Sequence, residues 1–227
     1  MNELSLKLLI IAMLLSEFYL PKNWTRVPLK HSLIYAIIQL TLIIPIFNWQ
    51  LALLAITLSM VHFLIHIPAK KNQWQLLRPL SLFVLIYIGV IYLILSGVTF
   101  QYVPWFNQAL QLLQIDLEAI ITWGLMLLFI YRPASRMVKY SLNQFRPNTS
   151  TIEEGHPNAG ALIGILERLM ILLFLSQGQF AAIGFILTAK SIARYNKIVE
   201  DPYFSEYFLL GTLLSSILVV GSYYLFF

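Results

Sequence analysis

Long apolar runs with almost no charged residues recur along the whole chain, and they constrain its fold more than any other feature. A helix that crosses a bilayer needs about 20 predominantly apolar residues, within a range of roughly 17–25. The runs cover residues 4–20, 33–47, 51–67, 80–96, 115–131, 161–175, 180–192 and 207–227. Several of these runs are as short as the lower end of that range or shorter. Their helices are therefore expected to end in the membrane–water interface, or one segment is expected to re-enter the membrane rather than cross it. The pattern predicts an all-α fold, a polytopic transmembrane helix bundle with about eight membrane segments.

The composition favours an integral membrane protein. Of the 227 residues, 59% are hydrophobic and 11% are charged, whereas a soluble domain carries roughly 25% charged residues. A soluble fold would lack the polar residues to cover its surface. The absence of cysteine excludes disulfides, thiolate nucleophiles and cysteine-ligated zinc sites. The net charge of +5 is modest, so we expect membrane lipids and no nucleic acid as partners.

Lysine and arginine alternate between the connections that join the runs. They follow the first, third, fifth and seventh runs, whereas residues 48–50, 97–114 and 176–179 contain none. The basic residues in question are Lys22, Arg26, Lys30, Lys70, Lys71, Arg78, Arg132, Arg136, Lys139, Arg146, Lys190, Arg194 and Lys197. The positive-inside rule then predicts a multi-pass protein with an N-out/C-out topology and basic loops in the cytoplasm. The first run lacks a small-residue cleavage motif, so we expect a retained helix rather than a signal peptide.

The longest polar stretch divides the chain into three predicted parts. Residues 1–131 form an N-terminal five-segment transmembrane part, and residues 160–227 form a C-terminal three-segment part. Residues 132–159, which contain three prolines and several basic residues, are predicted to be a cytoplasmic connecting loop. The sequence shows no internal repeat, phosphate-binding loop, dinucleotide-binding glycine pattern or nucleophile elbow.

Glu167 and Arg168 interrupt the apolar run 161–175 about 10 Å from its start, at 1.5 Å per helical residue. A charge inside lipid costs several kcal/mol unless it is paired or lines a wet cavity. Gly160 and Gly164 lie on the helix face of Glu167, and small residues let helices approach closely. We therefore expect Glu167 to face a neighbouring helix.

The partners of these two charges are predicted from their positions. Lys190 or Arg194, four residues apart in the next run, could meet Glu167. Arg168 projects about 100° away from Glu167, so it needs a different acid, either Glu206 or Glu17. Two structural alternatives stay open. The basic residues could extend to lipid headgroups, and the pair could only fix helix register.

A second polar group is predicted where the first three helices meet the cytoplasm. Glu17, His31, His62 and His66 lie there, and the last two share one helix face. Imidazole and carboxylate ligands suit a divalent metal such as Zn or Mn. The alternatives are an interfacial position for His31 and hydrogen-bonded helix packing for the other histidines.

The C-terminal third resembles the bacterial membrane family catalogued as domain of unknown function 3307. The residues that carry the resemblance are the segment GALIGILERLMILLFLSQGQFAAIGFILTAKSIARY and the following EYFLLGTLLSS. The family's motif residues match Glu167, Arg168, Lys190, Arg194, Glu206 and Tyr207 position by position. The resemblance implies a location in the bacterial cytoplasmic membrane and makes these six residues the ligand-binding candidates.

The N-terminal part resembles the same family through SEFYLPKNW, KHSLIYA and HFLIHIPAK. His31 and His62 match the family's pattern, whereas Met13 stands for a His, Glu17 for an Asp and His66 for another Asp. The family's His/Asp arrangement is similar to that of membrane-bound metal-dependent hydrolases. The resemblance therefore implies a divalent metal as cofactor, with Glu17, His31, His62 and His66 as its candidate ligands.

Three functions are compatible with these patterns. The first is an intramembrane charged site on the cytoplasmic side that binds an anionic ligand bearing a phosphate or a lipid headgroup. A metal-dependent membrane hydrolase could be built on it, with Glu17 and Glu167 as catalytic candidates. The second is a non-enzymatic small-molecule or lipid transporter. The third is a membrane-anchor subunit that docks a cytosolic protein through its basic loops.

Overall fold

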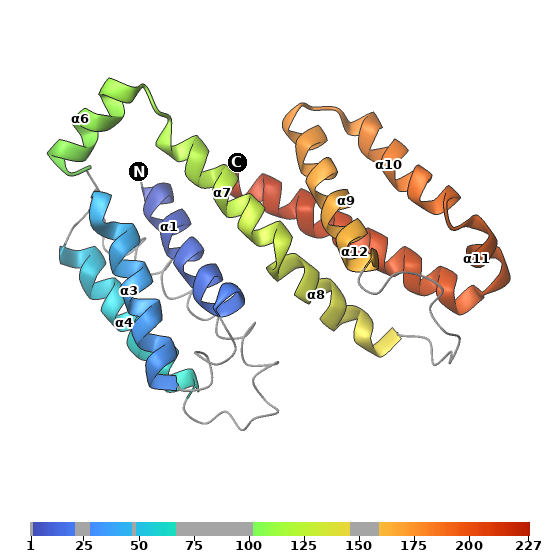
Figure 1. Cartoon of the computed structure of the whole chain (residues 1–227), viewed down its shortest axis with the longest axis horizontal. Coiled ribbons are helices and arrows are strands. Elements are labelled where there is room, and N and C mark those ends of the chain that lie inside the picture. The colour runs from blue at the N-terminus through green and yellow to red at the C-terminus, as the bar shows by residue number, and fades with distance from the viewer. Residues whose placement is uncertain (1, 21–27, 47–48, 67–101, 146–158) are drawn as a thin grey trace. The chain divides into compact units, whose positions relative to one another are not determined.

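The computed structural model describes residues 2–20, 28–46, 49–66, 102–145 and 159–227, and every element in these ranges is a helix (Figure 1). In chain order the elements are α1 (Asn2–Leu14), η1 (Leu15–Tyr19), α3 (Pro28–Ile43), η2 (Ile44–Ile46), α4 (Trp49–His66), α6 (Pro104–Leu113), α7 (Leu117–Tyr131), α8 (Pro133–Leu142), η3 (Asn143–Phe145), α9 (Ala159–Ser176), α10 (Phe180–Ile192), α11 (Tyr195–Glu200) and α12 (Pro202–Phe226). The chain forms two compact units, and the boundary between them falls within α7.

The first unit, Met1–Leu125, has its core between α1, α3 and α4. The fully or almost fully buried side chains there include Leu4, Leu9, Met13, Tyr35, Ile43, Leu51, Leu54 and Leu58. Near the N-terminus of α1, Lys7 Nζ donates to Thr122 Oγ1 at 2.9 Å and lies 3.6 Å from Glu118 Oε1. This basic residue therefore finds its partners in the first two turns of α7.

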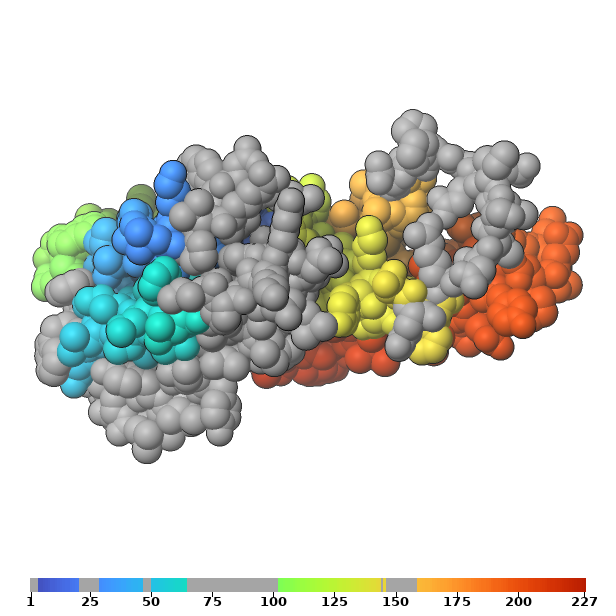
Figure 2. Space-filling model, turned by 90° about the horizontal axis from the view of Figure 1, so that it is seen from below, coloured from blue at the N-terminus to red at the C-terminus, as the bar shows by residue number. Residues whose placement is uncertain are grey.

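The second unit, Met126–Phe227, contains a helical hairpin of α9 and α10, and the long α12 packs against both α8 and α9. In the space-filling view the yellow side chains of α8 lie along the red ones of α12 (Figure 2). The core side chains are Met126, Ile130, Ile171, Leu172, Leu175 and Val219. These helices hold the charged residues of the C-terminal part in place.

Local sequence explains where the helices of this unit begin and end. Gly178, with a φ of +67°, ends α9, and only glycine adopts this left-handed conformation without steric cost. Its N–H donates to the Leu175 carbonyl at 3.0 Å, and the next N–H donates to the Phe174 carbonyl at 2.8 Å. This pair of bonds is the Schellman arrangement. At the start of α12, Asp201 Oδ1 accepts from Phe204 N at 3.1 Å, and Pro202 follows, as an N-terminal cap requires.

In the described ranges, four helices are long and apolar enough to cross a membrane: Leu29–Ile46, Leu117–Leu142, Ala159–Ser176 and Pro202–Phe226. The segments Gln50–Leu64 and Phe180–Ile192 are shorter apolar helices. The fold is thus the all-helical one expected of a membrane protein, but the predicted number of eight membrane segments is not supported. One physical reason is length, since the 13 residues of α10 span only about 20 Å of a hydrocarbon layer about 30 Å thick.

Two of the predicted segments lie wholly or partly outside the described residues. The predicted run 80–96 lies outside the described residues, as do residues 146–158 of the predicted connecting loop. The first part of that loop is helical, because α8 follows α7 after a break of one residue and the two form one apolar stretch, Leu117–Leu142. Pro133 has no N–H for the preceding turn, which accounts for the break.

Candidate functional site

Glu17, His31 and His62 come together in the first unit. Glu17 lies in η1 at the end of the first helix, His31 in the first turn of α3, and His62 in the last turns of α4. These three helix ends meet because α1, α3 and α4 pack side by side. His62 Nε2 lies 2.7 Å from Glu17 Oε1, and the three residues are 0–3% exposed. The cluster is therefore buried.

Backbone and hydroxyl oxygens hold the two imidazole rings. His31 Nε2 donates to the carbonyl oxygen of Ser16 at 3.0 Å. His62 Nδ1 lies 3.2 Å from Ser32 Oγ, and the two ring centroids are 4.7 Å apart. The Tyr35 ring packs 4.8 Å from the His62 ring. Each ring is thus fixed in orientation by its neighbours.

The wide turn η1 positions Glu17. Residues Leu15–Tyr19 form a π-helical turn in which Ser16, Glu17 and Phe18 are buried. A π turn inserts a residue into an α-helix and is frequent at functional sites. Here it turns both the Glu17 carboxylate and the Ser16 carbonyl oxygen toward the histidines. The apolar pattern of the sequence contains no signal for it.

The predicted metal ligands are brought together in part. One candidate ligand atom from each of Glu17, His31 and His62 lies within 4.8 Å of the others. The side chain of His66 lies outside the described residues, so its predicted role stays a prediction, as does metal binding. Two imidazoles and one carboxylate are a ligand set for a divalent transition metal, and the arrangement has the chemistry to hold one.

A polar network missed by the sequence analysis extends from this cluster. Gln39 Nε2 donates to Tyr35 Oη at 2.7 Å, and Ser59 Oγ donates to Gln39 Oε1 at 3.1 Å. Gln39, Tyr35 and His31 follow one another at four-residue spacing along α3, and all are 0% exposed. That spacing, which puts them on one helix face, is the signal that could have revealed a buried polar stripe.

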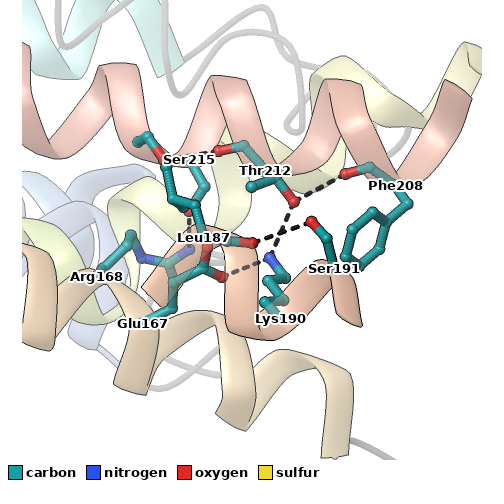
Figure 3. Close-up of polar contacts among 9 residues, drawn as sticks. Glu167, Arg168, Leu187, Lys190, Ser191, Phe208, Thr212 and Ser215 are labelled. Atoms are coloured by element: carbon teal, nitrogen blue, oxygen red, sulfur yellow. Dashed lines mark hydrogen bonds and ion pairs between the residues drawn. The ribbon is translucent and has the colours of Figure 1, made fainter. Parts of the chain in front are cut away.

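In the second unit, Glu167 and Lys190 form the pair predicted from the sequence. Lys190 Nζ, from α10, donates to Glu167 Oε2 at 2.5 Å and to Thr212 Oγ1 of α12 at 3.0 Å (Figure 3). Glu167 is 4% exposed, and its Oε1 atom accepts no hydrogen bond from the part of the chain that the structure describes. The confirmed pair therefore leaves one buried carboxylate oxygen open.

The predicted partners of Arg168 are wrong. Its guanidinium donates to the Ser215 hydroxyl at 3.1 Å (Figure 3), to the Ser135 hydroxyl at 2.5 Å and to the Ile130 carbonyl oxygen at 3.3 Å. Glu206 is exposed, and none of the hydrogen bonds described for Arg168 reaches an acid. The rotation away from Glu167 was predicted correctly, but it turns Arg168 toward the break between α7 and α8.

The expected close packing through Gly160 and Gly164 is also wrong for the described helices. A Cβ atom added at Gly160 would meet no described atom within 4 Å, and one at Gly164 would meet only Arg168 Nη1, at 3.5 Å. Gly164 thus lies beside the guanidinium rather than beside another backbone. Glu167 faces its neighbours because of its own position on α9, not because the glycines bring the helices together.

The remaining ligand-binding candidates, Arg194, Glu206 and Tyr207, have contacts separate from those of the Glu167–Lys190 pair. Arg194 is exposed at the end of α10, and its guanidinium carbon lies 5.8 Å from the centre of the Phe204 ring. Tyr207 is half-buried. Among the described residues, no hydrogen bond joins Arg194, Glu206 or Tyr207 to Glu167 or Arg168. Their role in ligand binding stays a prediction. Ser135, Thr212 and Ser215 take their place as the partners that the sequence analysis missed.

Comparison with known proteins adds no name to these sites. No family model, no curated protein and no solved structure matches the chain. The resemblance to the family of domain of unknown function 3307 therefore stays a prediction, and the sites are interpreted from their own geometry.

Proposed function

We propose that the chain is a multi-pass protein of the bacterial cytoplasmic membrane whose C-terminal unit binds an anionic, phosphate-bearing ligand through Arg168. The observation that carries this proposal is the surroundings of the guanidinium. Arg168 is 3% exposed, and its described hydrogen bonds all go to neutral oxygens. A buried charge without a counter-charge is unfavourable by several kcal/mol.

The charged side chains of the site carry a net positive charge. Glu167 pairs with Lys190 at 2.5 Å and also interacts electrostatically with Arg168. One negative charge therefore faces two positive charges, and one positive charge is left over. The end of α7 compensates part of it, because Arg168 donates to the Ile130 carbonyl and a helix C-terminus carries about half a negative charge. A bound anion would supply the rest.

The donors and acceptors around Arg168 favour a phosphate group. A guanidinium has more N–H donors than the three described bonds use, and its planar fork matches the spacing of phosphate oxygens. The ammonium of Lys190 and the hydroxyl of Ser215 supply further donors nearby (Figure 3). The open Oε1 atom of Glu167 would accept from a ligand hydroxyl. A phosphate with an adjacent hydroxyl, as in a glycerophosphate headgroup, fits this set.

The test uses the full chain in detergent and measures its thermal unfolding with inorganic phosphate, with phosphatidylglycerol and with phosphatidylcholine. We expect phosphatidylglycerol to raise the midpoint of wild type and of Lys197→Gln, a control that removes an exposed cation from the same unit. Arg168→Gln should lose that increase. A shift with inorganic phosphate as well identifies a free phosphate ligand, whereas a shift with the lipid alone identifies a headgroup.

Two results contradict the proposal. One is an equal increase for Arg168→Gln and wild type, which would place anion binding elsewhere. The other is no increase with either phosphate-bearing compound in a wild-type sample that unfolds cooperatively. Arg168→Lys separates charge from geometry, because it keeps the charge but loses the fork; retention of at most part of the increase is expected.

Transport of such a ligand is a second candidate function, favoured by the break between α7 and α8. Transporters often bind substrates at discontinuous helices near the membrane midplane. Here the break lies next to Arg168, because Arg168 contacts Ile130 on one side of it and Ser135 on the other. Exchange of labelled phosphate or lipid in proteoliposomes distinguishes the two: binding without exchange supports a binding protein only.

The proposal includes the N-out/C-out topology with about eight segments, some of them short. Two contacts within the first unit support it. Lys7 and Glu118 both fall at the predicted outer ends of their segments. Glu17 and His62 both fall at the predicted inner ends of theirs. Residues that are neighbours in space thus have the same predicted depth.

A further inference from the structure

We propose that Glu17, His31 and His62 form a binding site for a divalent first-row transition-metal ion, of the Zn²⁺ or Fe²⁺ type. The site belongs to the first unit and goes beyond the anion-binding function proposed for the second. The three residues are buried, and their candidate ligand atoms lie within 4.8 Å of one another. The inference depends on which atom each residue offers.

The hydrogen bond of His31 determines which of its nitrogens can bind a metal. Its Nε2 lies 3.0 Å from the carbonyl oxygen of Ser16. A carbonyl oxygen can only accept, so Nε2 carries the hydrogen, and the lone pair of the neutral ring lies on Nδ1. A metal-binding histidine commonly donates its other ring N–H to a backbone carbonyl in this way. His31 therefore offers Nδ1.

His62 is held by a partner that permits either tautomer. A serine hydroxyl both donates and accepts, and Ser32 Oγ lies 3.2 Å from His62 Nδ1. Without a metal, Ser32 donates to Nδ1 while His62 Nε2–H donates to the Glu17 carboxylate at 2.7 Å. With a metal, Nδ1–H donates to Ser32, and the lone pair of Nε2 is turned to the ion.

The number of protons at the site is the same in the state without the metal and in the state with it. His62 has one ring hydrogen in each, on Nε2 without the metal and on Nδ1 with it, and Ser32 keeps its hydroxyl hydrogen. Glu17 stays ionised and exchanges the His62 hydrogen bond for the cation. No proton need leave the site, and one negative carboxylate faces the positive ion. Ser32 is thus the residue that makes the exchange possible.

The distances are within reach of coordination. A tetrahedral ion with bonds of about 2.0–2.1 Å keeps its ligand atoms about 3.3 Å apart. Glu17 Oε1 and His62 Nε2, now 2.7 Å apart, would separate slightly. His31, one ring nitrogen of which lies within 4.8 Å of a ligand atom of each of the other two residues, would move closer to them. Two imidazoles and a carboxylate suit Zn²⁺ and Fe²⁺ better than Mg²⁺ or Ca²⁺. Three protein ligands leave a position for water or substrate, where a metal can act as a Lewis acid.

The test titrates the purified full chain in detergent with Zn²⁺ alone after chelator treatment. We expect wild type to bind one ion per chain. Glu17→Gln, which still accepts the His62 hydrogen bond, should weaken binding at least about 100-fold. Ser32→Ala should weaken it about 10–100-fold, the range found for residues that orient metal ligands. Ser59→Ala, another buried serine of the same bundle, is the matched control and should bind as wild type does.

The results that overturn the proposal are specific. Binding by Glu17→Gln or His31→Asn at the affinity of wild type would show that the metal is held elsewhere. Loss of binding in His156→Ala, which changes a histidine outside the cluster, would point to an adventitious site. Absence of Zn²⁺ binding by wild type that unfolds cooperatively would leave only a hydrogen-bonded cluster. Equal affinity of Ser32→Ala and Ser59→Ala would remove the role of Ser32.

Discussion

At the scale of single residues, hydroxyl groups are the main neutral partners of the buried charges and imidazoles. Arg168 bonds to Ser135 and Ser215, Lys190 to Thr212, and His62 to Ser32. A hydroxyl can donate or accept and rotates at little cost. Such partners compensate a buried ionic group in more than one state, which a fixed counter-charge does not do.

The pair of Glu167 and Lys190 predicts a measurable loss of stability. Glu167→Gln should lower the free energy of unfolding by about 2–3 kcal/mol, at or below the low end for breaking a buried pair because Lys190 is partly exposed. Titration of the purified protein with a denaturing detergent measures this change. Glu206→Gln, an exposed acid on α12, is the control and should change stability by less than about 0.5 kcal/mol.

A double-mutant cycle with Lys190→Met isolates the interaction. If the pair is real, the double variant should be more stable than the sum of the two single losses implies. Strict additivity of the two losses would show that the 2.5 Å contact contributes nothing to stability.

The residues that the sequence could predict are those whose chemistry is rare in an apolar run. Ionisable side chains stand out in such a run: Glu167 and Lys190 in the second unit, and Glu17, His31 and His62 in the first. Their predicted depth in the membrane assigned each of them to the correct polar cluster. Ser135, Thr212 and Ser215 could not be predicted, because serine and threonine are common in membrane helices, where they bond to their own backbone. The choice of partner for Arg168 therefore needed the packing of α8, α9 and α12.

At the scale of helices, the ends are set by local chemistry, while the lengths are not. Asp116 Oδ1 accepts from Ala119 N at 3.1 Å before α7, as Asp201 does before α12. Gln114, at a φ of 51°, ends α6 in the conformation that Gly178 adopts after α9. Capping residues, proline and glycine predict such ends. The π turn η1 and the joining of α7 and α8 in one apolar stretch depend on tertiary contacts and could not be predicted.

Gly178 gives a prediction at this scale. Gly178→Ala should lower the free energy of unfolding by about 1 kcal/mol, because alanine is disfavoured at a positive φ. The matched control is Gly184→Ala within α10, where an added Cβ meets no described atom within 4 Å. It should leave stability unchanged or raise it by up to about 1 kcal/mol, since alanine favours the helix. Equal effects of the two changes would contradict the role of the turn.

At the scale of the whole molecule, the positions of the basic residues distinguish a topology with four membrane crossings from one with about eight. If only the four long helices crossed, the residues before Leu29 and those between Ile46 and Leu117 would face opposite sides. Each of these parts contains three Lys or Arg residues, so between these two parts the positive-inside rule would give no preference. Additional short crossings restore the bias, which is why we retain them in the proposed topology.

Reporter fusions test this topology. A reporter active only in the cytoplasm should give signal when fused at residue 148 and none when fused at residue 178 or after residue 227. The reciprocal pattern is expected for a reporter active only outside the cytoplasm. Cytoplasmic signal after residue 227, with the signal at 148 retained, would mean that one of the last segments does not cross, and α10 is the shortest of them.

Helix α9, which carries Glu167 and Arg168, is synthesised before several of the residues that these two side chains contact. Helix α9 leaves the ribosome before α10 and α12, which supply Lys190, Thr212 and Ser215. Until those helices arrive, α9 carries two charges that lipid does not tolerate. The three helices are therefore expected to leave the insertion machinery together, with α9 waiting beside it until α12 has been made.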